Sequence, residues 1–269
     1  MAAPDFSGRA LEELIRLDGR GAVVTGGGRG IGYAISSRLA EAGAHVMIGD
    51  LDEASAKEAA DRIGQSGWKA SAAQLDASDV GALDAFADRA IGELGKIDIW
   101  VNNAGIYPMG PAIEMDESLW DRVLDLNLKG TFFGAQAAAK RMAADTGGVI
   151  INLASTAGFR GTPNATHYVA SKHGVRGLTR GLAAEFAPLG IRVLALAPTL
   201  IETPGIEEAK PAFAEMGLDN VIDAMVAMLP LGRAGVADDV ARVALFCASD
   251  LSAFMTGSTL PVDGGALAI

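Results

Sequence analysis

Two polar residues stand four positions apart in the segment NATHYVASKHGVRG, residues 164–177. If this segment is helical, Tyr168 and Lys172 lie on the same face of the helix. A tyrosine phenol titrates near pH ~10, and an ammonium group beside it stabilises the phenolate and lowers its pKa. The pair is therefore a candidate for proton transfer. The alternative is that the spacing is accidental, with the tyrosine at a surface and the lysine in water.

A glycine-rich segment earlier in the chain is a candidate anion site. TGGGRGIG follows an apolar run, precedes a helical pattern and has glycines at 26, 30 and 32. Gly26 permits a tight turn from strand to helix, and Gly30 and Gly32 let the backbone approach a pyrophosphate at the helix N-terminus. Glycine-rich turns also occur as plain connectors, so the motif is weak when taken alone.

Acidic and amide side chains close the next three apolar runs. A carboxylate at Asp50 accepts hydrogen bonds from the ribose hydroxyls of an adenosine and repels a 2′-phosphate, which favours NAD over NADP. Asp50 is also a good cap for the following helix, and Arg29 is able to attract a 2′-phosphate. Asp76 is placed to accept a hydrogen bond from an adenine amino group, and the amides of NNAG at 102–105 are placed to hold loops together.

These residues need a scaffold that brings the ends of several strands together. Short apolar runs alternate with helical patterns from residue 22 onward, and several runs are apolar throughout, as in strands buried on both faces. The alternation predicts an α/β fold with a doubly wound, mostly parallel sheet and helices on both faces. The seven predicted strands cover residues 22–26, 45–50, 69–76, 97–105, 148–155, 191–198 and 258–265.

We expect a single domain over residues 1–269, with an N-terminal extension at 1–19. Residues 199–236 depart from the alternation and are too long for an ordinary loop. They predict a pair of helices over the carboxyl edge of the sheet, where ligands bind in such folds. This segment is the predicted substrate-binding flap.

The composition excludes several classes of partner and site. A net charge of −11 repels phosphate backbones and anionic lipids, so we expect neither nucleic acid nor a membrane as a partner. No signal core or long apolar segment is present, which predicts a cytoplasmic protein. Cys247 is the one cysteine and cannot form a disulfide within the chain. The three histidines do not combine with it at metal-ligand spacing, so no metal site is expected.

Six motifs occur in one order along residues 20–265, and in them the chain resembles the short-chain dehydrogenase/reductase family in its single-domain form. They are TGGGRGIG, NNAG, Asn127 in LDLNLKG, Ser155 in NLASTAG, YVASK and the closing VDGG. Ser155 precedes Tyr168 by 13 residues, a separation that the family shows. The resemblance implies a seven-stranded Rossmann-type sheet and an NAD-dependent oxidoreductase that acts on CH–OH groups.

The resemblance also implies a catalytic set. Tyr168 would be the general base on an alcohol or the general acid on a ketone, with a pKa lowered by Lys172 and by the positive nicotinamide. Lys172 would bond the nicotinamide ribose, and Ser155 would polarise the substrate carbonyl. Asn127 would hold a water that links Lys172 to solvent.

Cofactor and substrate contacts follow from the same resemblance. Ile201 and Thr203 match positions that hold the carboxamide, although Thr199 stands where glycine is common. With no cation obviously placed for an anionic substrate, we expect a hydrophobic secondary alcohol or ketone in an apolar pocket that includes Tyr107 and His167. The expected substrate contacts are Ser155, Ala157, Phe159 and Tyr168. The expected cofactor contacts are Gly26, Arg29, Gly30, Ile31, Gly32, Asp50, Leu51, Asp76, Ala77, Asn103, Ala104, Gly105, Tyr168, Lys172, Pro198, Ile201 and Thr203.

Two other functions are compatible with these motifs. The NADPH-dependent 3-oxoacyl-(acyl-carrier-protein) reductases share all of them, but Asp50 and the acidic net charge argue against NADPH and an acidic carrier. A non-catalytic dinucleotide-binding scaffold would keep the fold without needing the complete catalytic set. The resemblance further implies a homotetramer in which helices near 116–144 and 164–188 pair between subunits.

Overall fold

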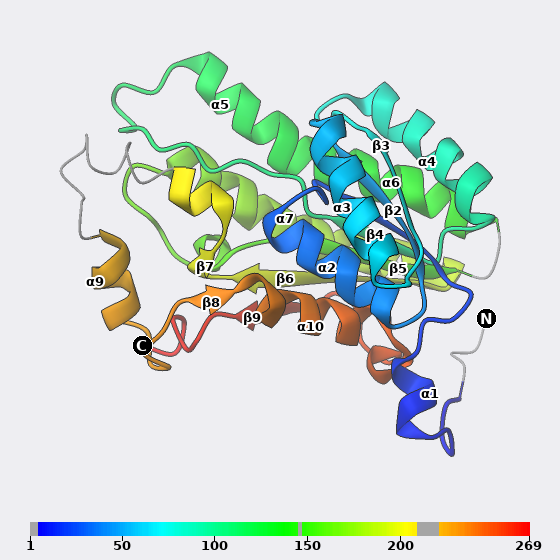
Figure 1. Ribbon diagram of the computed structural model, residues 1–269. Helices are drawn as coiled ribbons and strands as arrows, with labels where there is room; N and C mark the ends of the chain where they lie inside the picture. The colour runs from blue at the N-terminus through cyan, green and yellow to red at the C-terminus, as the bar shows by residue number, and fades with distance from the viewer. Residues whose placement is uncertain (1–4, 145–146, 209–220) are drawn as a thin grey trace.

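The computed structural model describes residues 5–144, 147–208 and 221–269. A parallel seven-stranded sheet runs through the molecule in the order β3-β2-β1-β4-β5-β6-β9 (Figure 1). The predicted sheet is therefore confirmed, with several strands shorter than expected. Because the order reverses between β1 and β4, a switch point lies at the carboxyl ends of these two strands. The strands are β1 (Gly21–Thr25), β2 (His45–Asp50), β3 (Ala70–Gln74), β4 (Ile99–Asn102), β5 (Gly148–Leu153), β6 (Ile191–Pro198) and β9 (Thr259–Val262).

Helices cover both faces of this sheet (Figure 1). One face carries α2 (Gly30–Glu41), α3 (Glu53–Gln65) and α10 (Ala237–Ala248). The other face carries α4 (Val80–Leu94), α6 (Thr131–Met142) and α7 (Thr166–Phe186), and α5 (Glu117–Leu124) packs beside α7. A short helix in the predicted N-terminal extension, α1 (Leu11–Ile15), contacts the 3₁₀ turn Asp250–Ser252.

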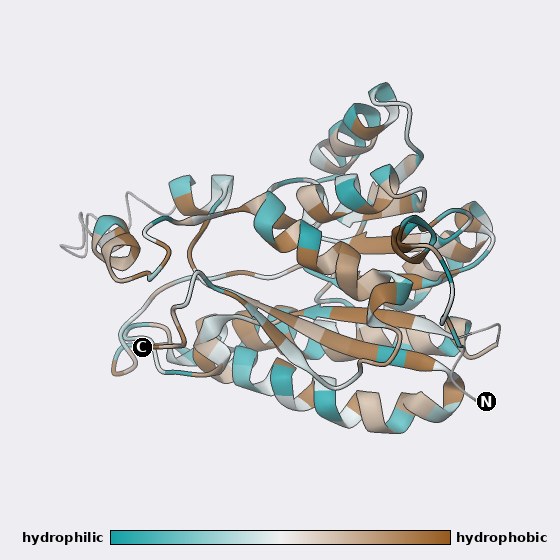
Figure 2. Ribbon diagram, turned by 90° about the horizontal axis from the view of Figure 1, so that it is seen from below, coloured by the Kyte–Doolittle hydropathy of each residue, from teal (hydrophilic) through white to brown (hydrophobic). Residues whose placement is uncertain are grey.

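The sheet is buried on both faces because adjacent residues of its central strands point into opposite cores. Val24 packs with the side chains of α2, α3 and α10, whereas Val23 packs with those of α4, α6 and α7. Both valines are 0% exposed. Figure 2 shows the resulting pattern, with hydrophobic strands between helices whose outer sides are more hydrophilic. This two-sided burial explains why the strand segments are apolar throughout.

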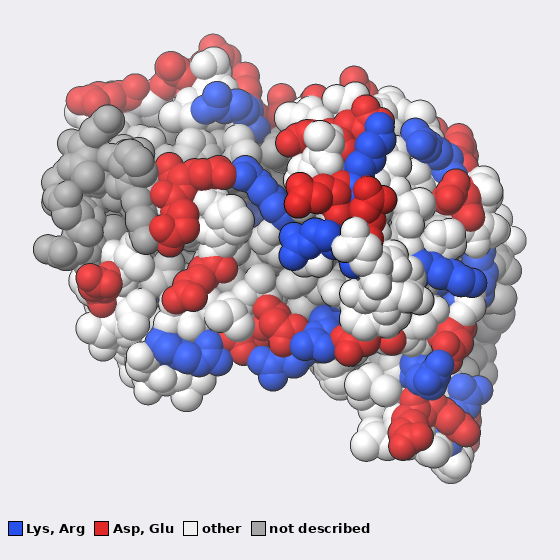
Figure 3. All heavy atoms as spheres, viewed as in Figure 1, with Lys and Arg blue, Asp and Glu red and all other residues white. Residues whose placement is uncertain are grey.

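Charged side chains of both signs share the surface. On the face shown in Figure 3, lysines and arginines lie beside aspartates and glutamates. Ion pairs at the start of α10 join Arg38 to Asp238 at 2.6 Å and Arg233 to Asp239 at 2.8 Å. Across the described residues, no helix is both long and apolar enough to cross a membrane.

The predicted flap matches the structure in part. Residues 204–208 are helical and α9 covers Val221–Ala227, while residues 209–220 lie outside the described residues. The flap also contains β7 (Ile201–Glu202), which pairs in parallel with β8 (Gly235–Val236) in a separate small sheet. This sheet was not predicted, because two residues are too few to show a periodic pattern.

Candidate active site

Ser155 stands just beyond the carboxyl end of β5. The predicted strand 148–155 ends at Leu153, and Ser155 is instead the N-cap of a 3₁₀ turn that covers Thr156–Gly158. Its Oγ accepts a hydrogen bond of 3.1 Å from the Ala157 amide. The turn takes the hydroxyl out of the strand register and holds it at the edge of the sheet.

The Tyr168 phenol lies close enough to the Ser155 side chain for that side chain to lower its pKa. Burial of the phenol raises the pKa of Tyr168 to about 12, and this effect outweighs that of Ser155, which lowers it. The physical reason is that desolvation disfavours the charged phenolate more than the nearby donor stabilises it. The lowered pKa predicted for Tyr168 includes the positive nicotinamide of a bound cofactor, so for the loaded site it stays a prediction.

Lys172 lies beside Tyr168 on the same face of α7, as their spacing predicted. Its residue is 5% exposed, and Nζ lies 5.5 Å from the centroid of the Tyr168 ring. Nζ donates a hydrogen bond of 2.7 Å to the carbonyl oxygen of Leu153. Burial lowers the pKa of Lys172 to about 8. The ammonium is thus held between α7 and the end of β5, and its charge changes close to neutral pH.

Asn127 lies in a π-helical turn, Asp125–Gly130, which joins α5 to α6. Such turns often occur at functional sites. The Asn127 side chain is fully buried and clamps the loop after β4: Nδ2 donates to the Ile106 carbonyl and Oδ1 accepts from the Ile106 amide, each at 2.9 Å. Its role in holding a water beside Lys172 stays a prediction.

The glycine-rich turn approaches the neighbouring backbone too closely for side chains. Gly26 has φ of +61°, and a Cβ on Gly32 would lie 2.1 Å from the Gly26 carbonyl oxygen. Within the described residues, no side chain caps the N-terminus of α2, where Arg29 is the N-cap. The amides of this first helical turn are therefore available to an anion. The turn fits the pyrophosphate of a dinucleotide.

Asp50 contacts this turn from the end of β2. Its Oδ2 accepts a hydrogen bond of 2.9 Å from the Gly28 amide, and its Oδ1 accepts one of 3.1 Å from the Asp52 amide. The alternative that Asp50 caps the following helix is wrong. Asp52 is the N-cap of α3, and its carboxylate accepts from the amides of Ala54 and Ser55.

The expected adenine and loop contacts lie at the ends of β3 and β4. Asn103 Nδ2 donates to the carbonyl oxygens of Thr25 and Gly26 at 3.0 and 2.8 Å, so this amide does hold the two loops together. Asp76 is exposed, and its Oδ1 accepts from the amide and the hydroxyl of Ser78 at 2.9 and 2.6 Å. The hydrogen bond from Asp76 to an adenine stays a prediction.

Other expected cofactor contacts follow the same edge. Leu51 is 64% exposed and Ala77 is 8% exposed. Ile31 is partly buried against the core, and Ala104 packs closely on the glycine-rich turn. A Cβ on Gly105 would lie 3.7 Å from Lys172 Nζ, so this backbone passes close to the Lys172 ammonium.

The flap reaches the glycine-rich turn at two points. Thr203 lies beside Gly30, where an added Cβ would stand 3.5 Å from the threonine methyl, and Arg29 forms an ion pair with Glu208. Pro198 is buried at the end of β6. Ile201 is 4% exposed and packs in the core, which leaves its backbone for a carboxamide.

The expected substrate contacts differ in how far their side chains are exposed to solvent. Ala157 is 6% exposed, and one face of the Phe159 ring is covered by Arg176, whose Cζ lies 3.5 Å from the ring centroid. Their contact with a substrate stays a prediction. His167 does not line an open pocket, because it is 0% exposed.

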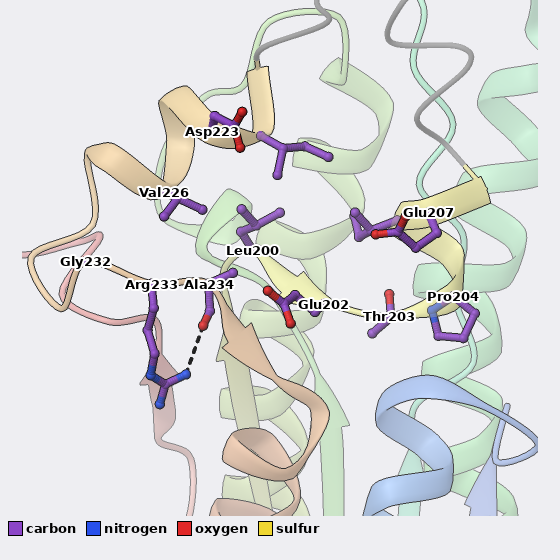
Figure 4. A pocket seen from close by; sticks show the side chains of 12 residues that line it. Leu200, Glu202, Thr203, Pro204, Glu207, Asp223, Val226, Gly232, Arg233 and Ala234 are labelled. Carbon is purple, nitrogen blue, oxygen red and sulfur yellow. Dashed lines mark hydrogen bonds between the residues drawn. The ribbon is translucent and has the colours of Figure 1, made fainter.

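A cavity of about 620 Å³ lies within the flap, between β7, the helical residues 204–208 and α9 (Figure 4). None of the four predicted catalytic residues lines it. At one side it reaches Thr203, which touches the glycine-rich turn. The lining residues are Leu200, Glu202, Thr203, Pro204, Ile206, Glu207, Ile222, Asp223, Val226, Gly232, Arg233 and Ala234.

Sequence reasoning missed a buried polar network behind the site. Trp100 Nε1 donates to Asn102 Oδ1 at 2.7 Å, Asn102 Nδ2 donates to Asn152 Oδ1 at 2.9 Å, and Asn152 Nδ2 donates to Thr179 Oγ1 at 3.0 Å. The network ties β4 and β5 to α7. Apart from Trp100 and Asn102, its members are far apart in the chain, so no local spacing indicates the network.

Comparisons with known proteins extend over nearly the whole chain. The family model described as enoyl-(acyl carrier protein) reductase matches residues 26–266. The D-threitol dehydrogenase of Mycolicibacterium smegmatis is 38% identical, over 93% of this chain and 94% of that protein. The 3-oxoacyl-(acyl-carrier-protein) reductase of Chlamydia muridarum is 37% identical, over 91% and 96%. A gluconate 5-dehydrogenase from Burkholderia cenocepacia, solved with NADP and tartrate, is similar in structure, with a TM-score of 0.89 and 37% identity over 97% and 100%.

Proposed function

The chain belongs to the short-chain dehydrogenase/reductase family of oxidoreductases, and on that premise we propose that it interconverts an uncharged secondary alcohol and its ketone with NAD. Tyr168 is the general acid and base of this proposal. The observation that carries it is the arrangement at the carboxyl edge of β5, where the Tyr168 phenol lies close to Ser155 and stands beside the buried ammonium of Lys172.

The hydroxyls of Ser155 and Tyr168 form the proposed binding pair for the reacting oxygen. When bound, the nicotinamide accepts or supplies the hydride. In oxidation Tyr168 takes the proton of the substrate hydroxyl, and in reduction it returns that proton to the oxygen. Ser155 donates a hydrogen bond where negative charge develops on this oxygen. Lys172 holds the first turns of α7, and with them Tyr168, against the end of β5, because its ammonium donates a hydrogen bond to the Leu153 carbonyl.

The preference for NAD rests on Asp50. Its carboxylate lies against the glycine-rich turn through the Gly28 amide, at the position where an adenosine ribose binds in this type of fold. A carboxylate there accepts hydrogen bonds from ribose hydroxyls and repels a 2′-phosphate. Arg29, the cation within this turn, forms an ion pair with Glu208.

An uncharged substrate is favoured because the two arginines near Ser155 already make contacts within the protein. Arg160 donates to the Ala266 carbonyl at 3.1 Å, and Arg176 donates to the Gly158 carbonyl and covers Phe159. Both guanidinium groups are therefore engaged within the protein.

Initial rates with purified protein test the proposal. The panel holds aliphatic and cyclic secondary alcohols, a polyol, a hydroxy acid and a 3-oxoacyl thioester, each assayed with NAD(H) and NADP(H). We expect the highest kcat/KM for an uncharged alcohol with NAD. A higher kcat/KM for the thioester with NADPH would make the protein a 3-oxoacyl reductase instead, and dinucleotide binding without turnover of any substrate would favour a scaffold.

We also propose that the protein is a homotetramer paired through α5 and α7. These helices lie together on the outer side of one sheet face, and Trp120 of α5 is 39% exposed. Light scattering coupled to gel filtration measures the mass directly. A mass of one chain at micromolar concentration would contradict the proposal.

A further inference from the structure

A second tyrosine touches the catalytic one. The rings of Tyr107 and Tyr168 have centroids 4.5 Å apart and an interplanar angle of 72°. This is the edge-to-face arrangement that aromatic pairs prefer, because the positive ring edge meets the negative ring face. Tyr107 belongs to the loop after β4 and Tyr168 to the first turn of α7, so the contact joins two separate segments of the site.

The loop that carries Tyr107 is clamped on both sides of this residue. On one side, the Asn127 amide makes two hydrogen bonds to the backbone of Ile106. On the other, the Gly110 amide donates to the Asn164 carbonyl at 2.8 Å, just before α7 begins. Three residues, 107–109, therefore lie between two fixed points, and the Tyr107 ring is presented to Tyr168 from a short, anchored segment.

The ring of Tyr107, and not its hydroxyl, makes this contact. Among the described residues, burial alone acts on the pKa of the Tyr107 phenol, and no hydrogen bond contributes to it. Burial raises the pKa of Tyr107, so the phenol is neutral at physiological pH. A neutral aromatic ring packed against Tyr168 restricts how far that side chain can turn from its staggered position.

We propose that Tyr107 is a positioning residue, whose ring holds the Tyr168 phenol toward Ser155. The inference rests on the proposed role of Tyr168 as the acid and base. Without the Tyr107 ring, Tyr168 gains room to rotate away from Ser155 and water gains access to the phenol. The proton-transfer geometry then becomes less populated, although Ser155, Lys172 and the glycine-rich turn keep their places.

Two substitutions separate the ring from the hydroxyl. Tyr107→Phe keeps the edge-to-face contact, and we expect it to keep most of the wild-type kcat. Tyr107→Leu removes the ring, and we expect kcat to fall by about tenfold or more, because small displacements of a reacting group are costly. A change in KM in either variant reports the separate place of Tyr107 in the expected apolar pocket. Phe133→Leu is the matched control, since Phe132 and Phe133 form another edge-to-face pair, 5.1 Å between centroids, on α6.

Phenol titration supplies a readout that does not depend on turnover. The chain has three tyrosines, Tyr33, Tyr107 and Tyr168, so the ultraviolet absorbance of tyrosinate reports few groups. In Tyr107→Phe one transition disappears and the high-pH transition of Tyr168 remains. In Tyr107→Leu we expect the Tyr168 transition to move to lower pH, because water reaches the phenol. Tyr107→Met serves the same purpose if the leucine variant does not fold.

Each result decides the inference. An equal loss of kcat in the phenylalanine and leucine variants would assign the effect to the hydroxyl and overturn it. So would a leucine variant with wild-type kcat and wild-type phenol titration. If the wild-type protein oxidises no alcohol, the proposed function fails, and the titrations still show whether the Tyr107 ring holds Tyr168.

Discussion

The ammonium of Lys172 donates a hydrogen bond of 2.7 Å to the carbonyl oxygen of Leu153, the last residue of β5. The bond ties the second turn of α7 to the central strand beside which Ser155 lies. It also gives a buried cation one strong acceptor, because the positive ammonium meets a carbonyl dipole at the end of a strand. Helix α7 is therefore attached to the sheet through one of the residues that we propose to be catalytic.

Burial of Lys172 predicts a pH dependence of folding. The pKa of Lys172 is about 8 in the folded protein, against its ordinary 10.5. From pH about 8 to about 10 the unfolded chain keeps this proton and the folded protein has lost it, so the free energy of unfolding rises with pH. The lysine contributes about 2 kcal/mol over this range, since one pKa unit corresponds to ~1.4 kcal/mol.

Urea unfolding of wild-type protein and Lys172→Met at several pH values measures this contribution as a difference. The difference is required because burial raises the pKa of Cys247 to about 12, which lowers the stability of both proteins in the upper part of the range. Parallel pH profiles for the two proteins would show that Lys172 keeps its proton in the folded state.

Tyr168→Phe removes the proposed proton donor and acceptor while keeping the ring that contacts Tyr107. We expect kcat to fall by about 10²- to 10⁴-fold, the usual contribution of general acid–base catalysis. Binding of NAD, measured by calorimetry, should be retained because the ring still fills its place. Full activity in this variant would remove Tyr168 from its proposed role.

Asp50→Ser should reduce the preference for NAD over NADP. Loss of the carboxylate removes its repulsion of a 2′-phosphate, and we expect the ratio of the two kcat/KM values to change by about tenfold or more. Asp52→Ala is the matched control, because it loses the N-cap of α3, at a cost of about 1 kcal/mol in stability. An Asp50 variant with the wild-type ratio would leave the preference without a structural basis.

Gly32→Ala should weaken dinucleotide binding without unfolding the protein. The added Cβ would lie 2.1 Å from the Gly26 carbonyl oxygen, so the first turn of α2 must move away from the glycine-rich turn. Gly64→Ala in α3 meets no atom within 4 Å and should raise stability by about 0.5–1 kcal/mol. NAD affinity measured for both variants makes the comparison. Wild-type affinity in Gly32→Ala would place the pyrophosphate elsewhere.

The main sheet was predictable because its strands are apolar throughout their length. Val23 and Val24 face opposite cores, so burial on both sides leaves an uninterrupted apolar run that is visible in the sequence. The pairing of Ile201–Glu202 with Gly235–Val236 leaves no such trace. Each of these two strands is two residues long, and the fold of the flap brings them together.

Neighbouring carboxylates show a second limit. Asp50 and Asp52 both precede α3, and both side chains are chemically suited to cap it. The structure decides between them, because Asp52 has the extended backbone of an N-cap and Asp50 is drawn to the Gly28 amide. Such a choice depends on where the glycine-rich turn, a different segment, places its donor.

The chain's sequence by itself determined that Tyr168 and Lys172 share one helix face, since helical periodicity relates residues four apart wherever the helix lies. It did not determine their protonation. The raised pKa of Tyr168 and the lowered pKa of Lys172 come from burial beneath segments distant in the chain, among them the Tyr107 loop and the end of β5. Tertiary structure decides such shifts because desolvation depends on all the atoms packed around a charge.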